Sequence, residues 1–501
     1  MKTFVYTGDQ AFFNDVCEIV RMFTGPATIA LLPAPRPAAE PFSASVLLGH
    51  RYAGGAFVNE AQVIIADGKG NVARRVRHRS VEPYTGKGGL AFRRFGKRAA
   101  KNAVYVCMHK AFPTRLPWGS LTGIRPTRLV REMYARGLGE TEAARALERE
   151  FFLEPQKARL LVKTVSNQRG VLATQGGRDL NVYIAIPFCV TRCVYCSFPS
   201  YALGQHEADV EPYLDALHEE IESAGRCAGE NGWKPRCLYV GGGTPTSIPA
   251  AALSSVVEHA LSAFGDFMEI TVEAGRPDTL DDARLFALRS LGVHRISINP
   301  QTMNAKTLRD VGRDHTPEDT VRAFGRAREA GFGFINMDLI LGLPGEGVKE
   351  AEHTLLEVLR LRPENLTVHT LALKRASALM QNREDYALPD AAAVSEMVDL
   401  SRRMAAENGY APYYLYRQKY MTGNFENVGY CLRGFPCAYN VDIMEETTSN
   451  MALGAGAISK RVFDAERRIE RLPNPKSLRH YIDNIGGHIA KKEAFFARAD
   501  D

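Results

Sequence analysis

Three cysteines carry the strongest chemical signal in the sequence. Residues 186–196 read IPFCVTRCVYC and place Cys189, Cys193 and Cys196 at the spacing C-x3-C-x2-C. Iron–sulfur clusters are held by cysteine thiolates, and a short loop lets several sulfurs converge on one cluster. Three ligands leave one iron of a four-iron cluster open to a small molecule, whereas a structural metal site is normally closed by a fourth ligand. The spacing therefore predicts a [4Fe–4S] cluster bound by these three cysteines.

Two other interpretations of the three cysteines stay open. They are a zinc site that takes a fourth ligand from a distant part of the chain, and three unrelated core cysteines. The first His or Cys after Cys196 is His206, ten residues on. The chain has nine cysteines, an odd number, and its start lacks the apolar core of a signal sequence. Both facts argue against a disulfide framework.

A glycine-rich segment is the second chemical signal. Residues 240–246 read VGGGTPT and follow a predicted strand. Glycine lets the backbone come close to a ligand, and the exposed amides and carbonyls of such a turn can bind polar groups. Taken alone, a glycine-rich turn is more often only a turn.

The elements that must position these residues alternate between strand and helix from residue 181 to about residue 375. Crossovers of this length imply a parallel sheet. Six units fit a partial (β/α) barrel, and a flat doubly wound sheet fits the pattern nearly as well. In both folds ligands bind at the C-terminal ends of the strands. The predicted strands are 182–186, 238–240, 270–273, 295–298, 334–339 and 366–371, and the helical segments between them include 211–224, 281–291, 317–330 and 348–361.

The remaining chain is expected to form further domains, because 501 residues are too many for one core. We predict a basic N-terminal accessory domain of α/β or mainly β type (1–110), a helical connector (111–180), the partial barrel (181–375) and a mixed C-terminal domain that covers the substrate (376–501). That last part is expected to contain a helix over 391–408.

Shorter signals refine the first two of these parts. In the first domain, Val63–Ile65 and Val104–Val106 are predicted strands, and the prolines of residues 33–41 predict an extended loop. In the connector, Thr141 is predicted to cap one helix and Pro155 to open the next.

Composition and charge narrow the class of protein. Hydrophobic residues make up 45% and charged residues 24%, and no run of eighteen apolar residues occurs. We therefore expect a globular cytoplasmic protein without a membrane span. The net charge of +6 hides a window, residues 69–110, with twelve basic residues and one acid. That window carries +11 and the rest of the chain −5. This density of positive charge predicts that the window attracts phosphates or carboxylates. The alternative interpretation is that the window is an ordinary solvated surface.

The C-x3-C-x2-C loop, with Tyr195 before its last cysteine, resembles that of the radical S-adenosylmethionine (SAM) enzymes. Within that superfamily the chain resembles the oxygen-independent coproporphyrinogen III oxidases, and most of all their long coproporphyrinogen dehydrogenase subgroup. The similar segments are YIAIPFC at 183–189, LTGIRPT at 121–127, YYLYRQK at 413–419 and NFENVGY at 424–430. The resemblance implies a partial (β/α)6 radical SAM barrel that binds a [4Fe–4S] cluster and SAM.

The resemblance also implies which residues meet SAM. The glycine-rich turn would bind its amino end, Arg313 its carboxylate, and carboxylates would accept from its ribose hydroxyls or ammonium group. The implied contacts are Tyr183, Tyr195, Gly242, Gly243, Thr244, Glu273, Gln301, Arg313 and Asp338, and the implied catalytic residues are Tyr183, Glu273 and Arg417.

The implied reaction is oxidative decarboxylation of two propionates of coproporphyrinogen III to vinyl groups. An electron entering the cluster cleaves SAM, the 5′-deoxyadenosyl radical takes a hydrogen from the propionate β-carbon, and carbon dioxide leaves. The implied electron donor is a flavodoxin or ferredoxin. The substrate carries four carboxylates, and Arg125, Arg128, Arg417 and Lys419 are expected to neutralise part of that charge, unless they form an ordinary basic surface.

Two departures from the family keep other functions open. Ser197-Phe198 stands where the oxidases have Gly-Cys, and Tyr439-Asn440 stands where the related haem chaperones have His-Asn. The alternatives are a radical SAM enzyme that opens or methylates a haem ring, a haem-binding or trafficking protein, and a tRNA-modifying enzyme. Nucleic acid ranks last, because few aromatic residues lie among the basic residues of 69–110. Cys431 and Cys437 could form a redox pair or a second site, and simple burial is the favoured alternative.

Overall fold

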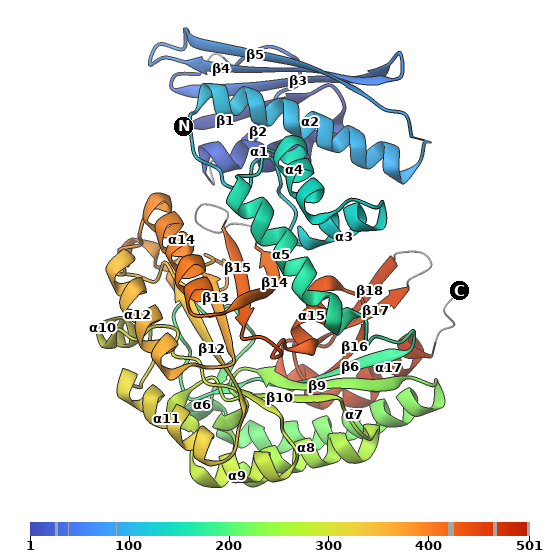
Figure 1. Ribbon diagram of the computed structural model, residues 1–501, viewed down its shortest axis with the longest axis vertical. Helices are drawn as coiled ribbons and strands as arrows, with labels where there is room; N and C mark the ends of the chain where they lie inside the picture. Colours follow the sequence, from blue (N-terminus) through green and yellow to red (C-terminus); the bar gives the residue numbers. More distant parts are fainter. Residues whose placement is uncertain (26–28, 39, 87, 419–424, 464–467, 498–501) are drawn as a thin grey trace. The chain divides into compact units, whose positions relative to one another are not determined.

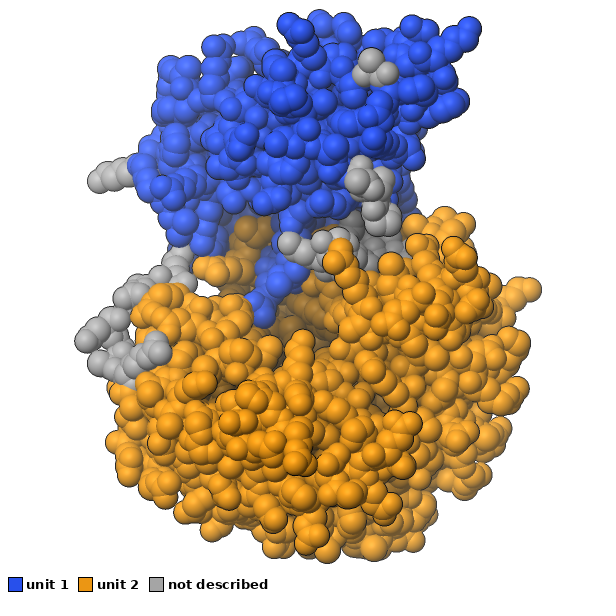
Figure 2. Space-filling model, turned by 180° about the vertical axis from the view of Figure 1, so that it is seen from behind, with its two compact units in different colours: residues 1–126, 132–162 blue, residues 127–131, 163–501 orange. Residues whose placement is uncertain are grey.

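The computed structural model describes residues 1–25, 29–38, 40–86, 88–418, 425–463 and 468–497. It divides into two compact units, shown in separate colours in Figure 2. Unit 1 comprises residues 1–126 and 132–162, and unit 2 comprises residues 127–131 and 163–501. The predicted connector, 111–180, is therefore shared between the units. The finer division into four domains stays a prediction.

Unit 1 is built on a five-stranded sheet with the order β2-β1-β3-β4-β5. β1 runs parallel to β2 and β3, and β3, β4 and β5 form an antiparallel meander. The strands are β1 (Lys2–Thr7), β2 (Ile29–Leu31), β3 (Ser43–Ala53), β4 (Ala56–Ala66) and β5 (Val72–Pro83), and the helices of this unit include α1 (Phe13–Thr24), α2 (Leu90–Ala111) and α4 (Glu140–Phe151).

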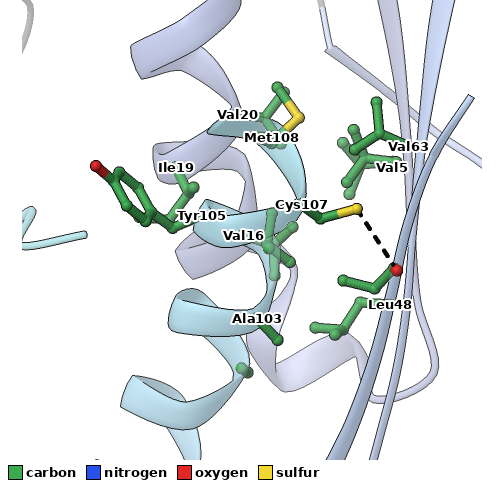
Figure 3. Packing of buried hydrophobic residues seen from close by; sticks show 14 of the residues in the cluster. Val5, Val16, Ile19, Val20, Leu48, Val63, Ala103, Tyr105, Cys107 and Met108 are labelled. Atoms are coloured by element: carbon green, nitrogen blue, oxygen red, sulfur yellow. Dashed lines mark hydrogen bonds between the residues drawn. The ribbon is translucent and has the colours of Figure 1, made fainter. Parts of the chain in front are cut away.

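The core of unit 1 lies between this sheet and the helices α1 and α2. Figure 3 shows Val16 of α1 and Cys107 of α2 facing Val5 and Val63 of the strands. The predicted strand Val104–Val106 is wrong, because these residues lie inside α2. The alanines and other apolar residues of α2 recur at helical spacing and form one buried face of the helix. Burial of this face outweighs the local β propensity of valine and tyrosine.

The other short signals of unit 1 gave mixed results. The prolines of 33–41 lie in the connection between β2 and β3, as predicted. Two helices join the units, α3 (Thr127–Ala135) and α5 (Pro155–Leu172), and Pro155 opens α5 as predicted. Thr141 is not a cap. α4 begins one residue earlier, where the Glu142 side chain accepts from the Gly139 amide.

Unit 2 contains six parallel strands that lie side by side in chain order. A doubly wound sheet would reverse its strand order at a switch point, so this order is that of a barrel. The two end strands do not pair with each other, and the barrel is therefore partial, as predicted. The six strands are β6 (Asp179–Ile186), β9 (Lys234–Gly242), β10 (Glu269–Glu273), β11 (Arg295–Ser297), β12 (Phe334–Leu341) and β13 (Asn365–Thr370).

Helices follow these strands and lie on their outer side (Figure 1). α11 shows why they begin where they do: Thr316 and Asp319 form a capping box around Pro317 at the first helical position. The helices are α7 (Val210–Glu230), α8 (Ala250–Phe264), α9 (Asp282–Ser290), α10 (Ala305–Asp310), α11 (Pro317–Glu329) and α12 (Val348–Leu361), and the cysteine loop adds α6 (Leu203–His206) and the short strands β7 (Phe188–Cys189) and β8 (Tyr201–Ala202).

The C-terminal residues extend the same sheet at both ends. β15 pairs antiparallel with β13, and β16 pairs parallel with β6. The helix predicted over 391–408 is confirmed as α14. These elements are α13 (Ala378–Gln381), α14 (Ala391–Glu407), β14 (Ala411–Arg417), β15 (Glu426–Cys431), α15 (Ala438–Glu445), β16 (Ser449–Leu453), β17 (Ile458–Phe463), β18 (Arg468–Pro473), α16 (Leu478–Asp483) and α17 (Ile485–Phe496).

The inner face of the barrel is not completely packed. The neighbours in sequence of Asp338 on β12 and of Tyr239 on β9 are buried against the helices, whereas Asp338 and Tyr239 are partly exposed. Since successive side chains of a strand point to opposite faces, the partly exposed residues line an interior hollow. The residues of this set are Tyr183, Tyr239, Glu273, Asp338, His369 and Tyr416.

No helix within the described residues is both long enough and apolar enough to cross a membrane.

Candidate active site at the strand ends

The cysteine loop leaves the end of β6 and is held by the turn after α10 and by an arginine. Thr191 Oγ1 donates to the Gly312 carbonyl at 2.9 Å, and Arg276 Nη1 donates to Thr191 Oγ1 at 2.7 Å. The Val194 amide donates to the Val311 carbonyl at 3.1 Å. Two separate segments thus fix a loop that has almost no regular structure of its own.

The loop gathers the three predicted ligands. Cys189 is buried, and Cys193 and Cys196 are partly exposed. Burial raises the pKa of the Cys189 thiol to about 11, and the nearby Cys196 and Cys193 thiols also raise it. A hydrogen bond from Thr244 acts to lower this pKa. Among the described residues, no three His, Cys, Asp or Glu side chains surround one metal ion.

The glycine-rich turn at the end of β9 packs directly against this loop. The Gly243 amide donates to the Ile186 carbonyl at 2.8 Å, and the Thr244 amide donates to the Phe188 carbonyl at 2.7 Å. A Cβ on Gly243 would lie 2.5 Å from the Phe188 oxygen and 3.0 Å from Cys189 Sγ. Thr244 Oγ1 donates to Cys189 Sγ at 3.5 Å. Only glycine allows this approach, and φ of Gly242, +114°, also requires glycine.

Two carboxylates face the hollow from the strand ends. Tyr239 Oη donates to Glu273 Oε1 at 2.7 Å, while burial and then the charge of Asp338 raise the pKa of Glu273 to about 7. Burial also acts to raise the pKa of Asp338, but hydrogen bonds from His369, Asn336 and Thr367 together hold that pKa below its usual value. The pair therefore differs in charge near neutral pH, Asp338 being ionised and Glu273 only partly so.

Gln301 and Arg313 leave polar atoms unsatisfied at the same edge. Gln301 has a left-handed backbone, φ 67°, and is fixed by hydrogen bonds to Asp338 and Ile340, while its Oε1 is buried and lacks a partner among the described residues. Arg313 Nη2 donates to the carbonyls of Gly275, at 2.7 Å, and Asn299, at 2.6 Å. Its Nε is buried without a partner within the described chain. Such orphaned groups are costly unless a ligand satisfies them.

Tyr183 is part of an aromatic wall that sequence analysis found only in part. The Tyr183 and Tyr239 rings stack at 6.1 Å, and the Tyr239 and Tyr439 rings stack at 4.4 Å. Tyr239 and Tyr439 were not predicted as site residues. The signal for Tyr239 was its place two residues before Gly241, on the same face of the strand. Tyr439 enters from α15, which no local pattern links to the barrel.

Tyr195 has a different environment from the other predicted contacts. Its ring packs in an apolar cluster with Val311, Leu343 and Leu379. Burial raises its pKa, and it lies beside Cys193 and Arg313. The structure therefore gives Tyr195 a packing role in holding the cysteine loop.

The predicted substrate residues are distributed more widely. Arg417 ends β14, buried opposite Glu426 of β15, and burial lowers the pKa of its guanidinium to about 10. Lys419 lies outside the described residues. Arg125 belongs to unit 1 and Arg128 to unit 2. His369 and Tyr416 were not among the predicted site residues: Tyr416 Oη lies 3.2 Å from His369 Nδ1, and His369 Nε2 lies 3.8 Å from Asp338 Oδ2.

Cys431 and Cys437 are both buried free thiols. Cys437 Sγ donates to Glu269 Oε1 at 3.2 Å, which gives this thiol a partner other than Cys431.

Comparison with known proteins agrees with this geometry. The model of the radical SAM superfamily matches residues 183–358. Together with the partial barrel and the three-cysteine loop, this match defines a radical SAM protein. The chain is 42% identical over 380 residues to the oxygen-independent coproporphyrinogen-III oxidase-like protein HemZ of Bacillus subtilis, covering 75% of this chain and 76% of that relative. The chain belongs to the family of oxygen-independent coproporphyrinogen-III oxidase-like proteins.

Two further relatives frame the family. The solved structure of coproporphyrinogen III oxidase (HemN) from Escherichia coli, a radical SAM enzyme, is similar with a TM-score of 0.50 and 26% identity, over 65% of this chain and 73% of that one. The heme chaperone HemW of Bacillus subtilis is 36% identical over 197 residues, 39% of this chain and 51% of that protein. The chain is thus similar both to proteins named for coproporphyrinogen oxidation and to a protein named as a heme chaperone.

The cofactors predicted from the sequence, a [4Fe–4S] cluster and SAM, are those of the superfamily. The residues present fit them. The three thiols gather in one loop, the glycine turn leaves no room for a Cβ, and Gln301 Oε1 and Arg313 Nε are buried polar atoms that a polar ligand would satisfy.

Proposed function

We propose that this protein is a radical SAM enzyme that oxidatively decarboxylates the propionates of coproporphyrinogen III, in haem biosynthesis. The observation that carries the proposal is the partly exposed inner face of the barrel, which combines an aromatic wall with carboxylates and a histidine at the strand ends. A cytoplasmic location and a flavodoxin- or ferredoxin-type electron donor belong to the same proposal.

In this proposal the cofactor residues have separate tasks. Cys189, Cys193 and Cys196 hold the cluster, which with SAM supplies the one-electron chemistry that removes a hydrogen atom from the substrate. Glu273 accepts from the SAM ammonium group, and Asp338 accepts from its ribose hydroxyls. Arg313 Nε and Gln301 Oε1, which have no partner among the described residues, bind the remaining polar groups of SAM. At Gly242, Gly243 and Thr244 the absence of bulky side chains lets the backbone of the turn contact the amino end of SAM.

The substrate is proposed to lie against the aromatic wall. The flat rings of Tyr183, Tyr239 and Tyr439 offer a stacking surface of the kind that a planar macrocycle contacts well. Arg417 is the proposed partner for a propionate, because a guanidinium can fork onto a carboxylate. Its pKa, though lowered by burial, stays near 10, so the group is charged at neutral pH. Enclosure by the strands keeps water away from the reacting carbon.

The test is anaerobic turnover. The protein is reconstituted with iron and sulfide, reduced, and given SAM and coproporphyrinogen III, while products are followed by mass spectrometry. Loss of two carboxyl groups together with 5′-deoxyadenosine is the expected result, and Cys193→Ala is the inactive control. SAM cleavage with unchanged coproporphyrinogen would redirect the proposal to another tetrapyrrole. Tight stoichiometric haem binding without turnover would overturn it in favour of haem trafficking.

A further inference from the structure

The basic window, residues 69–110, lies on two elements of the structure, the strand β5 and the helix α2. The basic residues of the two elements differ in their ion pairs and their exposure. Three basic residues of the helical half, on α2, have acidic partners within unit 1. Lys97 Nζ lies 3.0 Å from Asp15, Arg94 lies 3.6 Å from Glu132, and Arg98 bonds to Glu150. These three pairs offset part of the positive charge of α2.

The strand half, on β5, behaves differently. Val76 packs against the core beneath α1 and α2, so Arg75, Arg77 and Arg79 project from the opposite face of the sheet. All three are exposed and stand about 7 Å apart along the strand. Arg51 of β3 is exposed on the same face, because it pairs with Val58, which in turn pairs with Val81 of β5. No helix among the described residues of unit 1 covers these arginines.

The arginine row is held in place by a neighbouring amide. With its oxygen turned toward β5, the Gln62 side chain accepts from Arg75 Nε and Arg77 Nε, at 3.2 Å each. Bonding through Nε leaves the two-nitrogen ends of both guanidinium groups available for a bidentate contact. Arg79 has an ion pair with Glu60 at 3.5 Å, but both side chains are 63% exposed, so this pair holds the arginine weakly.

An exposed aromatic residue lies at the end of the sheet where β5 begins. Phe42 is 69% exposed and has a left-handed backbone, φ 51°. Its amide donates to the Asp67 carbonyl at 2.9 Å, in the turn that joins β4 to β5. Its ring lies against Gly68, where a Cβ would come within 2.7 Å of it. A solvent-facing ring held in this way is a platform for stacking rather than part of a core.

We propose that the open face of β3, β4 and β5, with Arg51, Arg75, Arg77 and Arg79, and with Phe42 at the end of the sheet where β5 begins, docks single-stranded RNA. The residue type favours this partner over an anionic membrane, because the face uses arginine, which forks onto phosphates and stacks on bases, and no lysine lies between residues 70 and 86. An alternative role for these arginines is to prevent β5, an edge strand, from pairing with another strand. Side chains of either charge would do this, and it would require neither the hydrogen bonds to Gln62 nor the exposed ring of Phe42. The proposal is independent of the reaction in unit 2.

The experiment measures binding of a fluorescein-labelled oligouridylate to the full-length protein by anisotropy, over a range of potassium chloride concentrations. R75E/R77E is expected to raise Kd by about 10-fold or more and to reduce the slope of log K against log salt by about 1.4, at about 0.7 per phosphate contact. R145E/R159E is the control, since both arginines are exposed on helices of the same unit. It removes the same charge and should leave most of the affinity.

Two single variants sharpen the result. E60Q removes an acid from this face and should tighten RNA binding, whereas F42A should weaken it by about 5-fold or more. Equal losses in R75E/R77E and R145E/R159E would overturn the proposal, because binding would then follow net charge alone. Binding to phosphatidylserine vesicles without binding to RNA would also overturn it and would identify a membrane surface. Circular dichroism and iron content confirm that each variant is folded.

Discussion

The two sides of the barrel opening are built by different means. On the side of β6, β9 and β10, the cysteine loop and the glycine turn meet through backbone contacts so close that a single Cβ on Gly243 would not fit. On the side of β12, β13 and β14, the facing groups are paired side chains: Asp338 with His369, His369 with Tyr416, and Arg417 opposite Glu426. The first side is proposed to hold the cluster and the amino end of SAM. On the second side, Asp338 is proposed to accept from the SAM ribose and Arg417 to bind a substrate propionate.

This difference indicates how each side responds to change. Backbone contacts at closest approach cannot relax, so a small substitution there displaces the whole loop. Paired side chains can lose one partner while the strands keep their positions. Substitutions in the cysteine loop and the glycine turn should therefore remove all chemistry, and substitution of Arg417 should mainly alter substrate affinity.

The largest effect is expected for Cys193→Ala. Loss of one of three ligands should abolish cluster retention and lower SAM cleavage by more than about 100-fold. Iron content and 5′-deoxyadenosine formation measure the two losses. Cys227→Ser is the control, because Cys227 lies on α7, outside the loop. Retention of a full cluster by Cys193→Ala would contradict the ligand assignment.

Gly243→Ala should follow, with SAM affinity and iron retention reduced by about 10- to 100-fold. The reason is steric, since the new Cβ would clash with the Phe188 carbonyl and Cys189 Sγ. The matched control is Gly229→Ala on α7, where the added Cβ meets nothing within 4 Å and helix propensity favours alanine. If both variants bind SAM like the parent protein, the close approach has no functional role.

A pH effect of intermediate size is expected from Glu273. Because burial raises its pKa to about 7, SAM affinity should rise by about 10-fold from about pH 6 to about pH 8, as the carboxylate forms. Glu273→Gln should show a flat profile, measured by isothermal titration calorimetry.

The same shift acts on stability in the opposite direction. A carboxyl whose pKa is raised in the folded state favours folding at low pH, and this contribution is lost as pH rises from about 4.5 through about 7. Thermal denaturation of the protein without SAM should therefore show a decline over this window that Glu273→Gln lacks. An unchanged decline in the variant would place the titrating group elsewhere.

The smallest effect is expected on the substrate side. Arg417→Gln should raise the KM for coproporphyrinogen III by about 10-fold, through loss of a charged partner for one propionate, with SAM binding unchanged. Arg403→Gln, an exposed position on α14, is the control. A loss of SAM affinity in Arg417→Gln would show that the two sides are not separate.

The contrast between the sides also explains what the sequence could predict. The cluster loop, the glycine turn and the six strands were predicted because their signals are local: cysteines at fixed spacing, consecutive glycines and alternating strand and helix. Tyr439 and Tyr416 were missed because they reach the hollow from elements far along the chain. Val104–Val106 was placed in a strand because three residues of β propensity hid the longer helical period of α2.

The position of Arg417 was predicted, but its surroundings were not. Its burial opposite Glu426 depends on the pairing of β14 with β15, and nothing in the local sequence states that register. Similarly, the basic residues of α2 have acidic partners because the fold brings Asp15, Glu132 and Glu150 to that helix. A count of charges along the sequence does not show this difference from β5.

The most direct test of the central claim is electron paramagnetic resonance of the reconstituted, reduced protein with and without SAM. Three cysteine ligands and an open iron predict a reduced [4Fe–4S] signal that changes when SAM is added, and the absence of this signal in Cys193→Ala. A cluster signal that SAM leaves unchanged would mean that the fourth iron is already closed by the protein, and it would contradict the site described for this chain.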